Sequence, residues 1–158
     1  MSILTRSEAE DILYREARLL DDRRYREWLE LFGENAKYWI PCNGEGTDPE
    51  REITLVYEDL PKLRDRVARL DSGMAHAQTP PSKTKRLISN VEVDNSGDDA
   101  ATVSSGFILY ELRRSKERVF AGRYEHSLRR IDGNWKIATK KVVLVNNDEV
   151  IDNLTFIV

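Results

Sequence analysis

Residues 118–146 read RVFAGRYEHSLRRIDGNWKIATKKVVLVN, and this stretch decides the fold class. It contains two long runs separated by Asp132-Gly133, a dipeptide that strongly favours a β-hairpin turn. One face of the first run is mainly apolar and carries Phe120, Tyr124, His126 and Leu128. The opposite face carries Arg123, Glu125, Ser127 and Arg129. This alternation predicts a long strand with one buried face, followed by an antiparallel partner.

The second run does not keep a single phase along its length. Apolar Trp135 and Ile137 share one expected face. Polar Thr139 and Lys141 follow on the same face, before apolar Val143 and Val145. A β-bulge, or a change in what covers that face, would explain the slip. Long strands with bulges and covering helices predict a sheet wrapped into a cone.

Further strands are expected on both sides of this hairpin. Residues 37–41, 86–94 and 102–113 are candidates, and a last strand is expected at residues 154–158. The segment 43–52 has the glycine, proline and acidic composition of a surface loop.

The first half of the chain carries helical patterns. The first helix is expected to begin with a capping box formed by Ser7 and Glu10. A second short helix is expected to end at Gly33, and a third to run from a cap at Asp59 to a stop at Gly73. Helices followed by long strands predict an α+β domain. We expect one domain over residues 1–158, with a helical part at about 5–72 and a sheet part at about 84–158.

Composition excludes several classes of function. The 158 residues include 25 Lys+Arg and 28 Asp+Glu, a formal charge of −3, which does not favour binding of nucleic acid. No apolar run approaches the ~20 residues of a membrane helix. Cys42 is the single cysteine, so no intrachain disulfide can form, and we expect a cytoplasmic protein with no membrane partner.

Metal chemistry is not expected in this chain. A Rieske cluster uses two cysteines and two histidines, and a mononuclear iron triad uses two histidines and a carboxylate. His76 and His126 are the only histidines, and neither lies in a metal-binding motif. The sequence therefore predicts no metal-ligating or cofactor-binding residues.

Acid–base chemistry stays open at His126. This histidine shares its expected apolar face with Tyr124, so a pocket inside the cone could use it as a general base. The simpler interpretation is a core histidine hydrogen-bonded to a neighbour. The acidic pair Asp21-Asp22 is expected to be a solvated helix end. No nucleophile or phosphate-binding motif is present.

Several strings of residues resemble the ring-hydroxylating dioxygenase β-subunit family. Residues 13–29, LYREARLLDDRRYREWL, are similar to that family's opening helices. Residues 38–41, YWIP, resemble its first strand. The strings RLISNV at 86–91, VNND at 145–148 and NLTF at 153–156 resemble its later landmarks in the same order.

The resemblance implies a cone-shaped α+β fold of the nuclear-transport-factor-2-like, or cystatin-like, class. It also implies a partner large (α) subunit that holds a Rieske [2Fe–2S] cluster and a mononuclear Fe(II) and dihydroxylates aromatic compounds. The assembly implied is α3β3, with a homotrimer of this chain, which would itself be structural and carry no catalytic residue. Two alternatives remain: a stand-alone dehydratase or isomerase using His126, and a binding module for a small apolar ligand.

The polar strand face suggests where subunits could meet. Arg123, Glu125 and Arg129 are unusual on a free sheet face, and we hypothesise that they cross a subunit interface. Complementary charges there would set register and specificity more than affinity.

Overall fold

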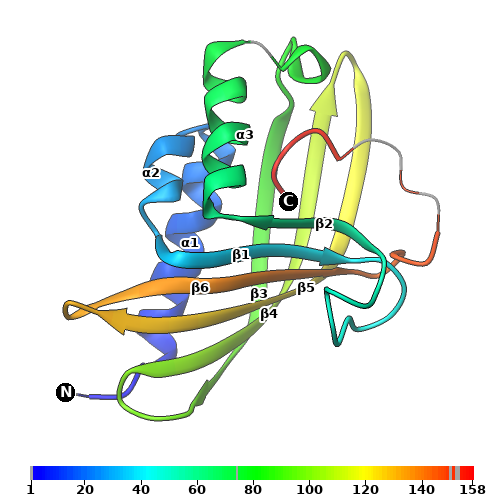
Figure 1. Ribbon diagram of the computed structural model, residues 1–158. Helices are drawn as coiled ribbons and strands as arrows, with labels where there is room; N and C mark the ends of the chain where they lie inside the picture. Colours follow the sequence, from blue (N-terminus) through cyan, green and yellow to red (C-terminus); the bar gives the residue numbers. More distant parts are fainter. Residues whose placement is uncertain (1, 74, 150, 152–153) are drawn as a thin grey trace.

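The computed structural model describes residues 2–73, 75–149, 151 and 154–158. A six-stranded, unclosed and strongly curved sheet has the strand order β2-β1-β6-β5-β4-β3. The helices gather on one side of this sheet (Figure 1). The predicted α+β cone is therefore confirmed.

The second half of the chain forms successive antiparallel strands, as predicted. They are β3 (Lys83–Asn95), β4 (Ala100–Arg113), β5 (Lys116–Ile131) and β6 (Asn134–Leu144). In the β5–β6 turn, Asp132 has φ 52° and Gly133 has φ 80°, the left-handed pair that a type I′ hairpin requires. The hairpin at Asp132-Gly133 is confirmed.

Strand β1 (Phe32–Pro41) departs from the predicted arrangement in two ways. It pairs in parallel with β6, so the sheet is mixed rather than wholly antiparallel. It also begins at Phe32, which pairs with Ile137, so the expected helix through Phe32 to a stop at Gly33 is wrong. Long-range pairing overrides the local helical spacing there, and α2 (Tyr25–Leu29) ends earlier.

Two other predictions about strands were incomplete or wrong. Strand β2 (Thr54–Asp59) was not expected, and it pairs antiparallel with the outer edge of β1. Residues 154–158 do not form a strand, because the main-chain groups of Ile157 and Val158 bind side chains instead of a neighbouring strand. Asn153, part of the last family-like string, lies outside the described residues.

The remaining helices are capped by side chains. Helix α1 (Arg6–Asp21) begins with a reciprocal capping box between Thr5 and Glu8, so the predicted box at Ser7 and Glu10 is two residues too late. Helix α3 (Leu60–Ser72) has the expected cap at Asp59. It ends at Gly73 with φ 72°, as predicted. A 3₁₀ turn, η1 (His76–Gln78), follows.

The phase slip in β6 is a β-bulge, one of the two explanations expected from the sequence. Ser127 pairs with Thr139 but Leu128 pairs with Ile137, so Ala138 is the extra residue. Ile137 and Lys140 consequently both become buried, although they are three positions apart. The bulge thus turns a lysine into the core.

A glycine lets β5 and β6 approach closely where the sheet bends. Gly122 pairs with Leu144, and a Cβ atom there would lie 2.1 Å from the carbonyl oxygen of Val143. No side chain fits in that space. The close approach helps to curve the sheet around the core, which includes buried residues of α1, α3 and the inner sheet face.

Candidate functional site

The concave side of the sheet holds a buried carboxylate with three donors. Glu16 lies in the apolar stripe of α1 and is only 3% exposed. Its Oε1 lies 2.8 Å from Nε2 of His126, and its Oε2 accepts from Nε1 of Trp28 at 2.9 Å. The Nζ atom of Lys140 lies 3.2 Å from the same Oε2. A buried charge needs such partners, and here they come from α2, β5 and β6.

Both members of the Glu16–Lys140 pair have shifted pKa values. Burial alone would raise the pKa of Glu16, but the Lys140 ammonium, His126 and the hydrogen bonds hold it well below its usual range. Burial lowers the pKa of Lys140 to about 8, although the Glu16 carboxylate acts to raise it. At neutral pH the site therefore contains a carboxylate beside an ammonium.

Next to this pair, Arg86 of β3 binds the end of α1. Its Nη1 donates to Oδ1 of Asp21 at 2.6 Å, and its main-chain N–H donates to Oδ2 at 3.0 Å. Thr84 donates to the same carboxylate at 3.0 Å. The expectation that Asp21 is solvated is wrong, because β3 packs beside the end of α1 and Asp21 neutralises the buried Arg86.

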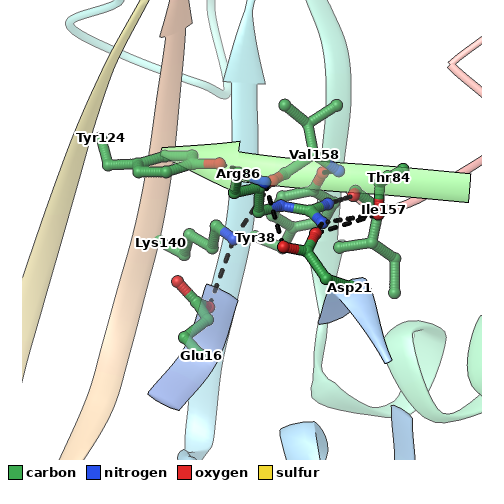
Figure 2. Close-up of polar contacts among 9 residues, drawn as sticks. All are labelled: Glu16, Asp21, Tyr38, Thr84, Arg86, Tyr124, Lys140, Ile157 and Val158. Atoms are coloured by element: carbon green, nitrogen blue, oxygen red, sulfur yellow. Dashed lines mark hydrogen bonds and ion pairs between the residues drawn. The ribbon is translucent and has the colours of Figure 1, made fainter. Parts of the chain in front are cut away.

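Residues 157 and 158 complete the site. The Tyr124 hydroxyl donates to the main-chain oxygen of Val158 at 2.9 Å, and Nζ of Lys140 donates to the same oxygen at 3.4 Å. The Val158 N–H donates to the Tyr38 hydroxyl at 2.9 Å. Nη2 of Arg86 donates to the Ile157 oxygen, so four side chains surround this short segment (Figure 2).

The hydroxyls in this site are held neutral. Burial raises the pKa of both Tyr38 and Tyr124 above the usual range of a tyrosine. Tyr124 therefore acts as a hydrogen-bond donor, and Tyr38 accepts the Val158 N–H.

The structure brings both pocket candidates of the sequence together. The rings of His126 and Tyr124 lie 5.6 Å apart, and His126 is 0% exposed. A substrate could reach Nε2 of this histidine only if Glu16 on α1 moved, because the two side chains already face each other. The arrangement is that of an ion-paired polar core.

The interface candidates lie on the opposite face of β5. Arg123 forms an ion pair with Glu45 of the loop after β1, and Glu125 is half-buried. Arg129 is exposed and lines a hollow of about 670 Å³ that opens where β1 and β6 separate. These three residues are thus on the outer face, away from Glu16.

Sequence reasoning missed the three charged residues that organise the site. Glu16 occupies a position in the apolar stripe of α1, which was a usable signal, because a charge in such a stripe requires a buried partner. Lys140 was hidden by the bulge, which moves it to the inner face. Arg86 gave no local signal, since its partners Asp21 and Ile157 are distant in sequence.

The described residues contain neither a metal-binding cluster nor a membrane-spanning helix. Within that part of the chain, no three His, Cys, Asp or Glu side chains are grouped to hold a metal ion. The side chain of His76 lies outside the described part. None of the described helices is long and apolar enough to cross a membrane.

Replacing Lys140 with methionine is expected to remove a rise in the free energy of unfolding that the parent protein shows as the pH increases through the alkaline range. The Lys140 pKa is about 8 in the folded chain and about 10.4 when unfolded, so the unfolded chain binds more protons between these pH values. The free energy of unfolding should therefore rise with pH across this window in the parent protein relative to Lys140→Met. Urea titrations from about pH 8 to about pH 10 measure this difference.

Lys141→Met is the matched control for that prediction. This neighbouring lysine lies on the other face, where its Nζ donates to the Gly46 oxygen at 2.7 Å. The control should keep the parent's pH dependence. If the free energy of unfolding changed equally with pH in the parent and in Lys140→Met, the prediction would be contradicted.

Comparisons with known proteins identify the family to which this chain belongs. The family model described as "Ring hydroxylating beta subunit" matches residues 15–152. The chain is 36% identical to the small oxygenase component of the p-cumate 2,3-dioxygenase system of Pseudomonas putida, over 145 residues that cover 90% of this chain and 81% of that protein.

Solved structures agree with this placement. The β subunit of benzoate 1,2-dioxygenase from Burkholderia mallei superposes with a TM-score of 0.79 and 27% identity, covering 99% of this chain and 100% of that one. A hexachlorocyclohexane dehydrochlorinase superposes with a TM-score of 0.66 and 14% identity, covering 89% of this chain and 84% of that one. This second similarity concerns the cone fold alone.

Proposed function

Because the chain belongs to the ring-hydroxylating β-subunit family and is the small subunit of a ring-hydroxylating dioxygenase, we propose that its role is structural. One observation carries this proposal. The acid–base groups inside the cone are paired with one another, and residues 156–158 are buried beside them. A general base should face a substrate, whereas His126 faces Glu16.

The partner in this proposal is a large subunit that performs the oxidation. It would hold a Rieske [2Fe–2S] cluster and a mononuclear Fe(II), since these centres need more cysteine and histidine ligands than this chain has. The proposed assembly is a cytoplasmic α3β3 hexamer in which this chain forms a trimer. Its aromatic substrate would bind in the large subunit, as an analogue of the p-cumate or benzoate for which relatives are named.

The outer sheet face supports an assembled state. Leu87 and Ile108 are direct cross-strand partners, and Leu87 is 62% exposed. Val119 on the neighbouring strand β5 and Val145, directly after the end of β6, are also exposed, Val145 at 75%. Exposed apolar side chains on and beside adjacent strands favour contact with another subunit.

Co-expression with the large subunit encoded beside this chain tests the proposed function. We expect the two chains to co-purify, iron to be present in the complex, and this chain alone to give no turnover. A large subunit that is fully active and correctly assembled without this chain would contradict the structural role.

A second candidate function rests on the His126–Glu16 contact, which resembles an acid–base pair. In that case the isolated chain would catalyse a dehydration or isomerisation, and His126→Ala would abolish it. Under the structural role, His126→Ala changes stability and no catalytic rate of the isolated chain. Activity assays on the isolated parent chain therefore separate the two functions.

Charge reversal at Arg129 is expected to weaken assembly. This side chain is exposed and, within the described residues, has no ion pair to lose, so Arg129→Glu should leave the stability of the isolated chain almost unchanged. If Arg129 crosses an interface, sedimentation velocity should show a smaller fraction of hexamer, with about a tenfold weaker association.

Two further variants complete this experiment. Arg123→Glu should act in the same direction, although it also breaks the exposed pair with Glu45. Arg64→Glu, on the exposed side of α3, is the control for a general effect of charge. Identical sedimentation of Arg129→Glu and the parent would remove this residue from the interface.

A further inference from the structure

Four side chains of the cone interior converge on the main chain of residues 157 and 158. Arg86, Lys140 and Tyr124 donate to its oxygens, and Tyr38 accepts its N–H. These donors come from three different strands (Figure 2). Such convergence of donors on oxygen atoms is what a carbonyl or carboxylate site requires.

Only some of the hydrogen-bond donors of the Arg86 guanidinium have acceptors. Its Nη1 binds Asp21 and its Nη2 binds the Ile157 oxygen, but its buried Nε has no hydrogen-bond partner among the described residues. Nε and Nη2 form one edge of the guanidinium, which matches the two oxygens of a carboxylate. The single oxygen of Ile157 occupies half of that edge.

The same chain shows how this edge binds a complete carboxylate. In Arg24, Nε donates to Oε1 of Glu27 at 2.8 Å and Nη2 donates to Oε2 at 2.6 Å. Arg66 turns the same edge toward Glu58, where Nε and Nη2 both donate to Oε1 and Nε also reaches Oε2 at 3.3 Å. Arg86 therefore offers, in a buried setting, a fork that two other arginines of the molecule fill with carboxylates.

The walls beside these donors are apolar. Phe120 forms one wall, and the Phe156 ring of the 154–158 segment packs against it edge-to-face at 5.5 Å. Lys140 lies over the Tyr124 ring, 4.8 Å from its centroid, and 5.8 Å from the centroid of Trp28. An occupant of this space would need an apolar body that ends in oxygen acceptors.

We propose that the concave side of the sheet is a binding site for an apolar carboxylate, and that residues 154–158 are its resident occupant. The Arg86 edge would take both ligand oxygens, and Tyr124 and Lys140 would donate to one of them. Arg86 and Lys140 are already balanced by Asp21 and Glu16, so hydrogen bonding rather than net charge would select the ligand. The site is independent of the proposed structural role in the dioxygenase.

A variant that lacks residues 154–158 provides the direct test. Calorimetric titration with the peptide Leu-Thr-Phe-Ile-Val as a free acid should give saturable binding at one site. The peptide amide should bind about 5- to 10-fold more weakly, because an uncharged amide replaces the carboxylate at the position of the Val158 oxygen, to which Tyr124 and Lys140 donate. Hexanoate, compared with hexanamide, shows whether a small apolar acid is sufficient.

Substitutions in the same shortened chain identify the donors. Arg86→Lys keeps the positive charge but removes the fork, and Tyr124→Phe removes one hydroxyl. Each should weaken binding of the peptide acid about 5- to 10-fold, whereas Arg24→Lys, at the exposed fork, should not change it. A shortened chain that retains its circular dichroism but binds neither acid would overturn the proposal.

Hydrogen exchange on the full chain gives a second test if the shortened chain does not fold. The Val158 amide donates to Tyr38, so it should exchange slowly in the parent. Excess peptide acid should displace the segment and raise that exchange rate at least tenfold, while amides in the middle of β5 stay protected. An unchanged Val158 rate at saturating peptide acid would reject the site.

Discussion

Glu16→Ala is expected to lower the free energy of unfolding by about 3–5 kcal/mol, because it leaves a buried ammonium without its carboxylate. Lys140 is 0% exposed, and Glu16 is the acid that lies beside it. The substitution also removes the acceptor of the Trp28 indole N–H and the partner of His126 Nε2. Urea unfolding at neutral pH, followed by circular dichroism, measures the loss.

A control on the same helix separates the loss of the buried Glu16 carboxylate from the general effect of removing a negative charge from α1. Glu10 lies on α1 in an exposed i,i+4 pair with Arg6, so Glu10→Ala should change stability by less than about 0.5 kcal/mol. The double variant Glu16→Leu with Lys140→Met should recover most of the loss seen in Glu16→Leu alone, since it leaves no unpaired charge. A loss of less than 1 kcal/mol in Glu16→Ala would show that Lys140 finds another partner.

Gly122→Ala is expected to cost about 3 kcal/mol or more, despite adding only one methyl group. The new Cβ would lie 2.1 Å from the carbonyl oxygen of Val143 and 3.0 Å from Cα of Leu144. Both contacts are with backbone, so β6 must move away from β5 to relieve them. Thermal unfolding should show the loss, and hydrogen exchange should show faster exchange at the β5–β6 ladder around Leu144.

Gly106→Ala on the adjacent strand is the matched control. Its Cβ would meet only the Ser89 hydroxyl at 3.5 Å and the Ser89 carbonyl at 3.8 Å, which are ordinary contacts. The expected change is less than about 1 kcal/mol, because alanine also restricts the unfolded chain. Equal losses in the two variants would mean that strand glycines act through entropy and not through the close approach of β5 and β6.

The part of the fold that could be predicted from sequence is the part with strong local patterns. Alternation in β5 placed Phe120, Tyr124, His126 and Leu128 on one face, and all four are buried. The Asp132-Gly133 turn and the caps of α3 also carry their information within a few residues. Family-like strings along nearly the whole chain then indicated the function.

Features set by distant partners could not be predicted in this way. Strand β2 is half-buried along its whole length, so it has no alternation to detect, and β1 alone determines its place in the sheet. The 154–158 segment has the composition of a strand, but side chains of Arg86 and Tyr124 bind its main chain. The charge cluster at Glu16 depends on a one-residue bulge more than 100 residues away.

The separation between Glu16 and its partners constrains when the chain can fold during translation. Glu16 and His126 are 110 residues apart, and Tyr38 and Val158 are 120 apart. At about 5–20 residues per second, the ribosome needs on the order of 10 s to connect such positions. The first helices are therefore made early, yet β1 gains its parallel neighbour β6 only after the intervening strands β2 to β5 have been made. The amphipathic helices that begin the fold must therefore remain soluble until β5 and β6 have been made.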